Sequence, residues 1–424
     1  MNLPPAKNKN LKILILSAPI GSGHRMAAAA LEEALLRLDH VEVVQGNVFD
    51  FFPGVIGKAF LKFYETVLTV CPWLYALSYR WSNRDGGSLW MRNLLNGILL
   101  RLGKPFIEEV KPDAVFSTHA TPTGILSLYK QKYDANLWLG VVVTDFTVHR
   151  WLVCPGADAY FVADEKLFGQ IECASGHCIK NAGLQDDCPG IDVVQYQAGN
   201  EKHSETRPAL YSWGIPVRGR FTEKREPAAV RQETRNRSGW PADAFVCLLA
   251  GGGGGMLPME EIVRSMQNEK FKDIYVVAVT GHNDGLRKKL EAMQKWFLKS
   301  EANAGISRLT VLGFTDEMPQ LMQAADVVIT KAGGVSLAEC LECGANTLIY
   351  HPLPRQEQGN TVFLQQNYGV EAVTDIRQLD DYLERERKVS LPERLQRQNA
   401  RKQRYGYRAA AGRIADLTDK LRNR

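Results

Sequence analysis

The residues best suited to chemistry form an ordered series within residues 326–360. An apolar stretch at 327–330, expected to be a buried strand, is followed by Gly333 and Gly334, and residues 335–343 have helical spacing. Glycines at the beginning of a helix leave backbone N–H groups and the positive end of the helix dipole accessible to an anion. The sequence therefore predicts that a diphosphate binds at this turn.

Polar side chains beyond this turn fit the rest of a nucleotide-sugar. Ser336 and Glu339 lie in the expected helix, and Glu339 could accept hydrogen bonds from both hydroxyls of a ribose. A further expected strand at 347–350 leads to a polar group at the same sheet edge, namely Gln356, Glu357 and Asn360. A Gly-Gly pair alone can be no more than a tight turn. The ordered series of phosphate, ribose and sugar contacts favours a nucleotide-sugar site.

Three other loops follow expected strands at this edge. The five consecutive glycines Gly251–Gly255 exceed what a turn needs, so we expect Gly252 and Gly253 to wrap a diphosphate or to make room for an acceptor. Gly281 and Phe314 follow the next two expected strands. Backbone groups at Phe314 could pair with the edge of a uracil base.

Candidates for proton transfer come from the first half of the chain. His24 ends the loop at 21–24, and histidine suits a general base because its usual pKa is about 6.5. Asp145 follows an expected strand and could orient His24 or be the base itself. The alternatives are a capping or packing role for His24 and a helix N-cap for Asp145. The loop resembles the start of a dinucleotide-binding fingerprint, but Met26 occupies the position of the third glycine.

No metal ion or other cofactor is expected besides a UDP-sugar as co-substrate. The chain has no D-x-D triplet, the carboxylate pair that commonly holds a divalent cation beneath a sugar nucleotide. The helix dipole and the glycine loops would then stabilise the departing diphosphate. Three cysteines and two histidines occur within residues 172–207, but their C-x4-C-x9-C spacing matches no zinc motif. We interpret that polar stretch as a surface insertion.

The scaffold expected for these residues is a pair of doubly wound α/β domains. Apolar strand-like runs alternate with helical segments in both halves, which is typical of parallel sheets covered on both faces. A chain of 424 residues is long enough for two domains. The expected boundaries are 1–213, 214–381 and a basic helical segment at 382–424. Open α/β sheets bind ligands at the carboxyl ends of their strands, so we expect the domains to face each other across a ligand-binding cleft.

Basic and aromatic residues are concentrated in residues 51–104, where seven basic residues stand against two acidic ones. Such a segment suits an anionic membrane surface, although its aromatic residues could instead pack in the core. No run reaches the roughly 20 apolar residues that span a bilayer. No signal peptide is visible, and most cysteines are single residues in apolar segments. We expect a cytoplasmic protein, peripheral on the inner face of the cell membrane, with no nucleic-acid partner.

Several motifs together resemble the monogalactosyldiacylglycerol synthases and the bacterial processive diacylglycerol β-glucosyltransferases. They are G-S-G-H at 21–24, P-W-L-Y at 72–75, T-D-F-x-x-H from Thr144, G-I-P-V from Gly214, K-A-G-G-x-S-L-A-E from Lys331 and Q-E-x-x-N from Gln356. The resemblance covers roughly residues 11–373 without the insertion, which has no counterpart in the family. Ala332 stands where bacterial relatives often have proline, and Arg355 replaces a glycine.

The resemblance implies a GT-B glycosyltransferase that inverts the anomeric carbon, uses a UDP-hexose donor and a diacylglycerol acceptor, and attaches peripherally to membranes. It assigns diphosphate and ribose contacts to Gly333, Gly334 and Glu339, sugar contacts to Gln356 and Glu357, and the base position to His24. Arg355, beside the sugar contacts, could favour an acidic sugar. We therefore predict hexose transfer from a UDP-sugar to a membrane lipid. The alternatives are a transferase for another lipid-linked acceptor and a non-catalytic UDP-sugar-binding regulator.

Overall fold

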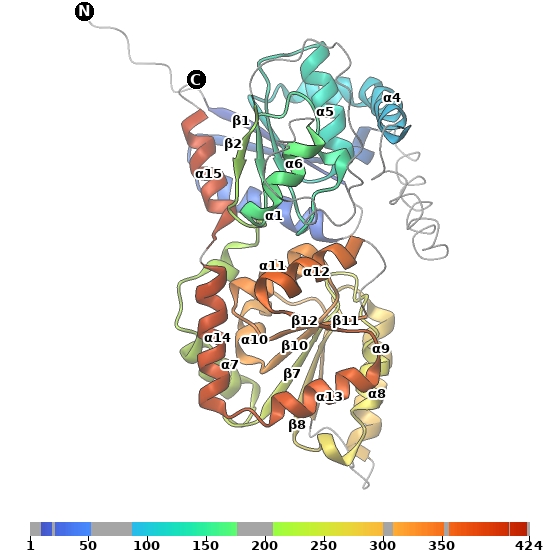
Figure 1. The fold of residues 1–424 in the computed structure, drawn as a ribbon, viewed down its shortest axis with the longest axis vertical. Coiled ribbons are helices and arrows are strands. Elements are labelled where there is room, and N and C mark those ends of the chain that lie inside the picture. Colours follow the sequence, from blue (N-terminus) through green and yellow to red (C-terminus); the bar gives the residue numbers. More distant parts are fainter. Residues whose placement is uncertain are drawn as a thin grey trace, which may run out of the picture. The chain divides into compact units, whose positions relative to one another are not determined.

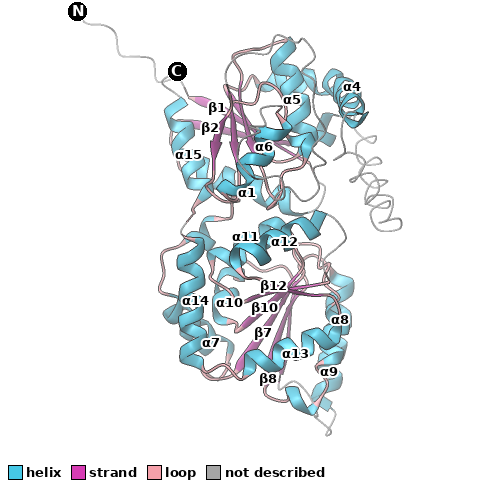
Figure 2. Ribbon diagram, in the orientation of Figure 1, coloured by secondary structure: helices cyan, strands magenta, loops and turns pink. Residues whose placement is uncertain are grey.

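The computed structural model describes residues 10–18, 22–51, 87–175, 207–299, 308–351, 356–406 and 408–421. The chain divides into two compact units. Unit 1 comprises residues 1–218 and 409–424, and unit 2 comprises residues 219–408. Each unit contains one six-stranded parallel sheet with helices on both faces (Figures 1 and 2). The expectation of two doubly wound α/β domains is confirmed.

The sheet of unit 1 has the strand order β2-β1-β3-β4-β5-β6. Its strands are β1 (Leu11–Ser17), β2 (Val41–Asn47), β3 (Ala114–Ser117), β4 (Trp138–Val142), β5 (Ala159–Phe161) and β6 (Ala209–Tyr211). Its helices are α1 (Ser22–Leu35), α4 (Gly87–Val110), α5 (Ala120–Lys132), α6 (Phe168–Ala174) and α15 (Ala410–Leu421), with short 3-10 turns η1 (Val48–Phe51), η2 (Arg150–Leu152) and η3 (Glu165–Leu167). The winding direction reverses between β1 and β3, so their carboxyl ends form the switch point of this sheet.

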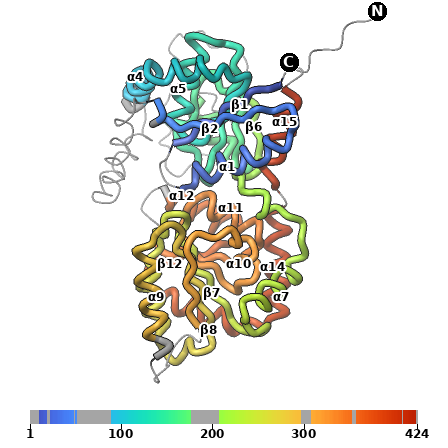
Figure 3. The backbone as a smooth tube through the Cα atoms, turned by 180° about the vertical axis from the view of Figure 1, so that it is seen from behind, coloured from blue at the N-terminus to red at the C-terminus, as the bar shows by residue number. Residues whose placement is uncertain are grey.

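One face of this sheet is covered by two helices that are far apart in the sequence. Apolar residues of α1, such as Leu31 and Leu35, pack with Ile13 and Ile15 of β1 and with Ile414 of α15 in one core cluster. Figure 3 shows the red α15 within unit 1, close to the blue β1. The basic segment 382–424 is therefore not a separate element, because α15 packs in unit 1 and the helices before it in unit 2.

The sheet of unit 2 has the strand order β12-β11-β10-β7-β8-β9. Its strands are β7 (Phe245–Ala250), β8 (Ile274–Val279), β9 (Arg308–Leu312), β10 (Val327–Thr330), β11 (Thr347–Tyr350) and β12 (Glu371–Val373). Its helices are α7 (Pro227–Ser238), α8 (Met259–Ser265), α9 (Asp284–Lys299), α10 (Met318–Ala324), α11 (Gly334–Glu342), α12 (Gln356–Tyr368), α13 (Ile376–Arg387) and α14 (Leu391–Tyr405), with 3-10 turns η4 (Gly219–Thr222) and η5 (Glu269–Phe271). Here the switch point lies between β7 and β10.

The strands lie where the sequence predicts them because they coincide with continuous apolar stretches. Every residue of β7, β10 and β11 is buried, as continuous hydrophobic strands of a covered parallel sheet should be. Two details differ from the sequence analysis. Strand β6, which lies next to the 172–207 stretch, was not expected, and α1 begins at Ser22 rather than near Met26. His24 therefore lies in the first turn of a helix and not in a loop.

A buried ion cluster fixes the amino end of β10. Asp326, the residue before β10, binds Arg231 and Arg235 of α7 at 2.7 Å each and Arg394 of α14 at 2.6 Å. Its carboxylate also accepts a hydrogen bond from the backbone N–H of Val246 in β7 at 2.8 Å. The Asp326 side chain is fully buried, so its charge is held entirely by these partners. The cluster joins both switch-point strands to α7 and α14.

Replacing Asp326 with asparagine should destabilise unit 2 by about 3–5 kcal/mol, because three guanidinium groups lose their anion in a buried site. Urea unfolding followed by circular dichroism measures this change. The control is Glu371→Gln, which breaks an exposed ion pair with Arg385 whose side chains are 52% and 54% exposed. That substitution should cost about 1 kcal/mol or less. Equal costs for the two variants would show that the buried cluster has no special role.

Candidate functional site

The loops after β7 and β8 bring glycines together at the carboxyl edge of the sheet of unit 2. A Cβ atom added at Gly255 would lie 2.4 Å from the carbonyl oxygen of Thr280. One added at Gly281 would lie 2.4 Å from the carbonyl oxygen of Gly253, and both glycines have positive φ angles of 61°. The His282 N–H also donates to the Gly253 carbonyl at 2.9 Å. Close packing between the two loops thus explains why residues 255 and 281 are glycines.

Within that glycine loop, Gly252 also has a left-handed backbone, with a φ of 68°. The amide N–H groups of Gly255 and Met256 donate to the carbonyls of Gly252 and Gly251 at 3.0 Å each. The loop is therefore a closed turn stabilised from within. The predicted diphosphate contact at Gly252 and Gly253 stays a prediction, and the structure adds an internal reason for the glycines around it.

The turn after β10 has the geometry of an anion site. Gly333 is the N-cap of α11, with no side-chain cap, and Gly334 is the first helical residue. The first amide N–H groups of a helix have no intrahelical acceptor, and the helix dipole adds positive potential there. Ser336 and Glu339 are both half-buried residues of α11. The structure therefore brings together the residues predicted to hold the diphosphate and the ribose.

An ion pair lies beside this turn. The Nζ atom of Lys331 is 2.6 Å from Oε1 of Glu357, a residue of the first turn of α12. The same Nζ atom is 3.1 Å from the position that a Cβ atom would occupy on Gly333. Asn360 is fully buried, and its amide donates to the Ala332 carbonyl at 2.9 Å. Asn360 therefore fastens α12 to the turn, and its predicted sugar contact stays a prediction.

An aromatic pair marks the end of β9. Phe314 is 48% exposed and stacks on His282, with ring centroids 4.6 Å apart and an interplanar angle of 10°. A flat, exposed surface of this kind suits a nucleobase face. The sequence analysis expected a backbone contact with uracil at Phe314, and the stacking with His282 was not foreseen, since it depends on two loops separated by thirty residues or so of sequence.

The switch point of unit 1 holds His24. Its Nδ1 atom is 2.6 Å from the carbonyl oxygen of Thr118, just after β3, and 2.8 Å from the hydroxyl of Thr144, just after β4. A carbonyl oxygen can only accept, so Nδ1 carries the proton and donates to Thr118. The lone pair of the neutral ring then lies on Nε2. This tautomer can take up a proton at Nε2, as a general base must.

The charge state of His24 follows from its surroundings. Burial lowers the pKa of His24, and this effect exceeds the opposing effects of the Asp145 carboxylate and of the Thr118 hydrogen bond, both of which raise it. The ring is therefore held neutral at pH 7. The Nδ1–H group donates to the Thr118 carbonyl and has the Thr144 hydroxyl oxygen as a second acceptor, while Asp145 acts on the ring through its charge.

A second histidine, which the sequence analysis missed, lies against this ring. His119 meets His24 edge to face, with ring centroids 4.8 Å apart, and caps α5 by accepting from the Thr121 N–H at 3.2 Å. Burial, followed by the charges of His24 and His149, lowers the pKa of His119 well below its usual value. Its position directly after β3 was the available signal, since strand ends at this edge carry the other site residues.

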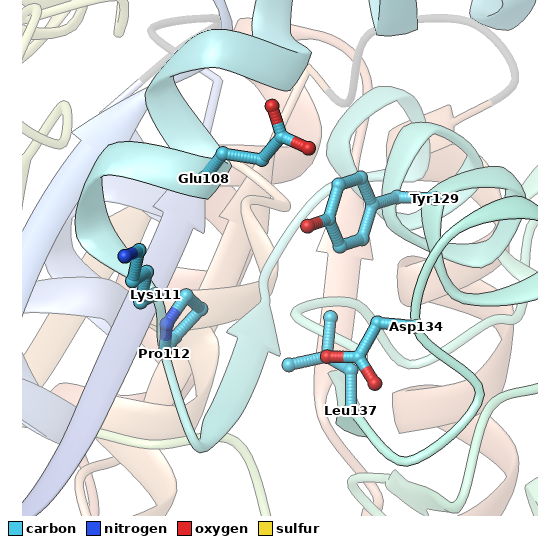
Figure 4. Close-up of a pocket in the computed structure, with 6 residues that line it drawn as sticks. All are labelled: Glu108, Lys111, Pro112, Tyr129, Asp134 and Leu137. Carbon is cyan, nitrogen blue, oxygen red and sulfur yellow. The ribbon is translucent and has the colours of Figure 1, made fainter.

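A recess of unit 1 lies at the opposite sheet edge. It has a volume of about 420 Å³ and is lined by Glu108, Lys111, Pro112, Tyr129, Asp134 and Leu137 (Figure 4). Pro112 and Leu137 precede β3 and β4, whereas Thr118 and Thr144 follow these strands. None of the predicted site residues lines this recess, so we do not assign the reaction to it. In the described part of the chain, no group of three or more metal-binding side chains is found.

Helix α4 carries an exposed apolar stripe. Trp90, Leu94, Ile98 and Leu102, spaced four residues apart, are 58%, 52%, 51% and 39% exposed. Two residues counted with the expected membrane-facing group are buried instead. Phe51 is 6% exposed, and Arg92 is 7% exposed with its guanidinium donating to the Val153 carbonyl at 3.1 Å.

Several predicted features lie outside the described residues. They are Gly21, the segment 52–86, most of the 172–207 stretch, Arg355 and the side chain of Gln356. The four buried cysteines of the described residues, Cys154, Cys247, Cys340 and Cys343, are free thiols, as expected. No described helix is both long and apolar enough to cross a bilayer.

Comparison with known proteins finds a matching family model in each half of the chain. Residues 24–175 match the sequence model of the monogalactosyldiacylglycerol synthase family, and residues 246–417 match that of the glycosyltransferase family 28 C-terminal domain. The processive diacylglycerol β-glucosyltransferase of Bacillus subtilis is 25% identical over 358 residues, which cover 84% of this chain and 82% of the relative. That of Bacillus mycoides is 25% identical over 371 residues, covering 87% and 83%.

Solved structures agree on the fold. Acinetobacter baumannii MurG matches with a TM-score of 0.58 and 13% identity, over 97% of this chain and 99% of that protein. Anabaena HepE, determined in complex with UDP, matches with a TM-score of 0.51 and 12% identity, over 97% and 100%. These likenesses confirm the GT-B fold, and the sequence matches confirm the family resemblance inferred from the motifs.

His24 should titrate below the usual pKa of histidine, because burial disfavours its charged form. Asp145→Asn should lower this pKa further, since it removes a negative charge that favours the imidazolium. Histidine-selective NMR titration measures both values, and the resonance is assigned by its loss in His24→Gln. With a neutral ring as the predicted base, activity should persist into mildly acidic pH and fall only below the lowered pKa. A pKa at or above the usual value would contradict the buried, neutral ring.

Proposed function

We propose that this UDP-sugar-dependent GT-B glycosyltransferase, which is similar to the monogalactosyldiacylglycerol synthases, transfers a hexose to diacylglycerol with inversion at the anomeric carbon. The observation that carries this proposal is the fixed tautomer of His24, whose Nδ1 is held by Thr118 and whose Nε2 keeps its lone pair. Single-displacement transfer needs one base and no covalent intermediate. The names of the Bacillus relatives support a diacylglycerol acceptor.

In the proposed reaction, Nε2 of His24 removes the proton of the acceptor hydroxyl as its oxygen attacks the anomeric carbon. The bond from that carbon to the diphosphate oxygen breaks, and its electron pair stays on the departing UDP. His24 becomes an imidazolium, which the nearby Asp145 charge favours and which returns its proton to solvent. We expect no essential metal ion, because the N-terminus of α11 can stabilise the charge on UDP.

The donor contacts belong to unit 2 under this proposal. The amide N–H groups at Gly333 and Gly334 would bind the diphosphate, and Glu339 would accept from the ribose hydroxyls. The exposed pair of Phe314 and His282 would carry the uracil. Glu357, which begins α12 beside the turn, would accept from hydroxyls of the sugar.

The reaction is proposed to take place on the inner face of the cell membrane. The apolar stripe of α4 would enter the lipid boundary, with Arg101 and Lys104 of the same helix near anionic headgroups. Between Trp90 and Lys104 this helix has no acidic residue. An amphipathic helix with these two features suits a peripheral and salt-sensitive attachment.

The proposed function is tested with purified protein, UDP-glucose, UDP-galactose and UDP-glucuronate, and vesicles containing diacylglycerol or total lipid extract, read by mass spectrometry. We expect one UDP-sugar to give a glycosylated diacylglycerol. His24→Ala should lower kcat by about 10²–10⁴-fold and leave UDP affinity unchanged, because the base does not touch the donor. Glycosylation of another lipid class would overturn the diacylglycerol assignment, and UDP binding without turnover would favour a regulator.

Replacing Trp90, Leu94 and Ile98 together with alanine should release the protein from anionic vesicles. Each buried apolar side chain contributes about 1.5–3 kcal/mol, so the three together should weaken binding more than 100-fold in a flotation assay. Added salt should weaken wild-type binding, because each basic residue near the surface contributes about 1 kcal/mol. The control is Trp296→Ala in α9, an equally exposed tryptophan at 62%. Unchanged flotation of the triple variant would exclude α4 as the membrane contact.

A further inference from the structure

The ion pair of Lys331 and Glu357 lies where a cation is unfavourable. The Lys331 ammonium is 3.1 Å from the Cβ position of Gly333, the N-cap of α11. A helix N-terminus is positive and repels a neighbouring cation. Glu357, whose side chain is 9% exposed, compensates this at a distance of 2.6 Å. Replacing a shielded ion pair by apolar residues is often neutral or stabilising, so folding alone gives little reason for this lysine.

A diphosphate would reverse the balance at this position. Its charge is attracted by the α11 N-terminus and by the Lys331 ammonium, which would then reinforce each other. Resting on the proposed function, we propose that Lys331 binds the diphosphate of the UDP-sugar. When the donor binds, Glu357 gives up its ion pair with Lys331 and accepts hydrogen bonds from the sugar hydroxyls instead. Glu357 holds Lys331 beside the N-terminus of α11.

The exchange needs little movement, because Lys331 and Glu357 both lie beside the turn that precedes α11. Lys331 is the residue after β10, and Glu357 lies in the first turn of α12. The Asn360 amide ties α12 to the Ala332 carbonyl at 2.9 Å. Rotation of two side chains is then enough, without movement of either helix.

Lys331 would also contribute to the chemical step. When the bond between the anomeric carbon and the diphosphate oxygen breaks, its electron pair leaves with UDP, which gains one negative charge. The Lys331 ammonium stabilises this charge without giving up a proton. In enzymes with a D-x-D motif a divalent cation supplies such compensation, and this chain has no D-x-D triplet. Removal of a preorganised group that faces developing charge typically lowers kcat by about 10²–10³-fold.

Lys331→Met and Glu357→Gln separate this role from a structural ion pair. Isothermal titration of the full chain with UDP, UMP and uridine should show that Lys331→Met weakens UDP binding by about 10–100-fold. Uridine binding should be unchanged, because uridine has no phosphate. Glu357→Gln should leave UDP affinity equal or higher, since it frees Lys331, and should lower kcat through loss of the sugar contact. Lys331→Arg should recover most of the UDP affinity.

The control is Lys289→Met, which removes a lysine from an exposed ion pair with Glu260 in the same unit. It should change neither UDP affinity nor kcat. Equal weakening of UDP by Lys331→Met and Glu357→Gln, or equal weakening of UDP and uridine by Lys331→Met, would make the pair structural and overturn the inference. Wild-type protein that fails to bind UDP would overturn the proposed function itself. Far-UV circular dichroism and a urea midpoint test whether each variant is folded. If Lys331→Met does not fold, the comparison of Lys331→Arg with Glu357→Gln decides the question.

Discussion

The buried carboxylate of Asp326 is the interaction on which the rest of unit 2 depends. A single charge with no exposure must be fully paired, and its partners come from α7, α14 and the backbone of β7. This requirement fixes where β10 begins and which residue of β7 it faces. Four strand residues later the same chain reaches Lys331 and Gly333. The register set at one edge of the sheet therefore determines the position of the anion site at the other.

The two units treat charge in opposite ways. In unit 1, burial lowers the pKa of His24 and that of His119, and the neutral His24 ring keeps a lone pair for proton uptake. In unit 2, a helix N-terminus and the ammonium of Lys331 concentrate positive potential at one turn. The first arrangement suits a group that must change its protonation state. The second suits a group that must keep its charge while a ligand gains one.

Local features could be predicted from the sequence, and features made by distant residues could not. Strands β7, β10 and β11 are continuous apolar runs in the sequence. The glycine turn before α11 could be predicted because Gly333 and Gly334 lie where a helical pattern begins. By contrast, the Lys331–Glu357 pair joins residues 26 positions apart, and the His24–Thr118 contact joins residues 94 apart. Arg92 looked like a surface cation because composition does not show that Val153 lies beneath it. The packing of the glycine loop against the loop at 280–283 could not be predicted either, because the two loops are equally remote in the sequence.

The position of α15 has a consequence for the order in which the protein can be made. Leu31 and Leu35 of α1 are covered by a helix that follows all of unit 2 in the sequence. At synthesis rates of roughly 5–20 residues per second, the ribosome needs on the order of 20–75 s to pass from α1 to α15. During that interval the helix that bears His24 has an exposed apolar flank. Unit 1 therefore reaches its final packing only after unit 2 has left the ribosome, although its sheet is translated first.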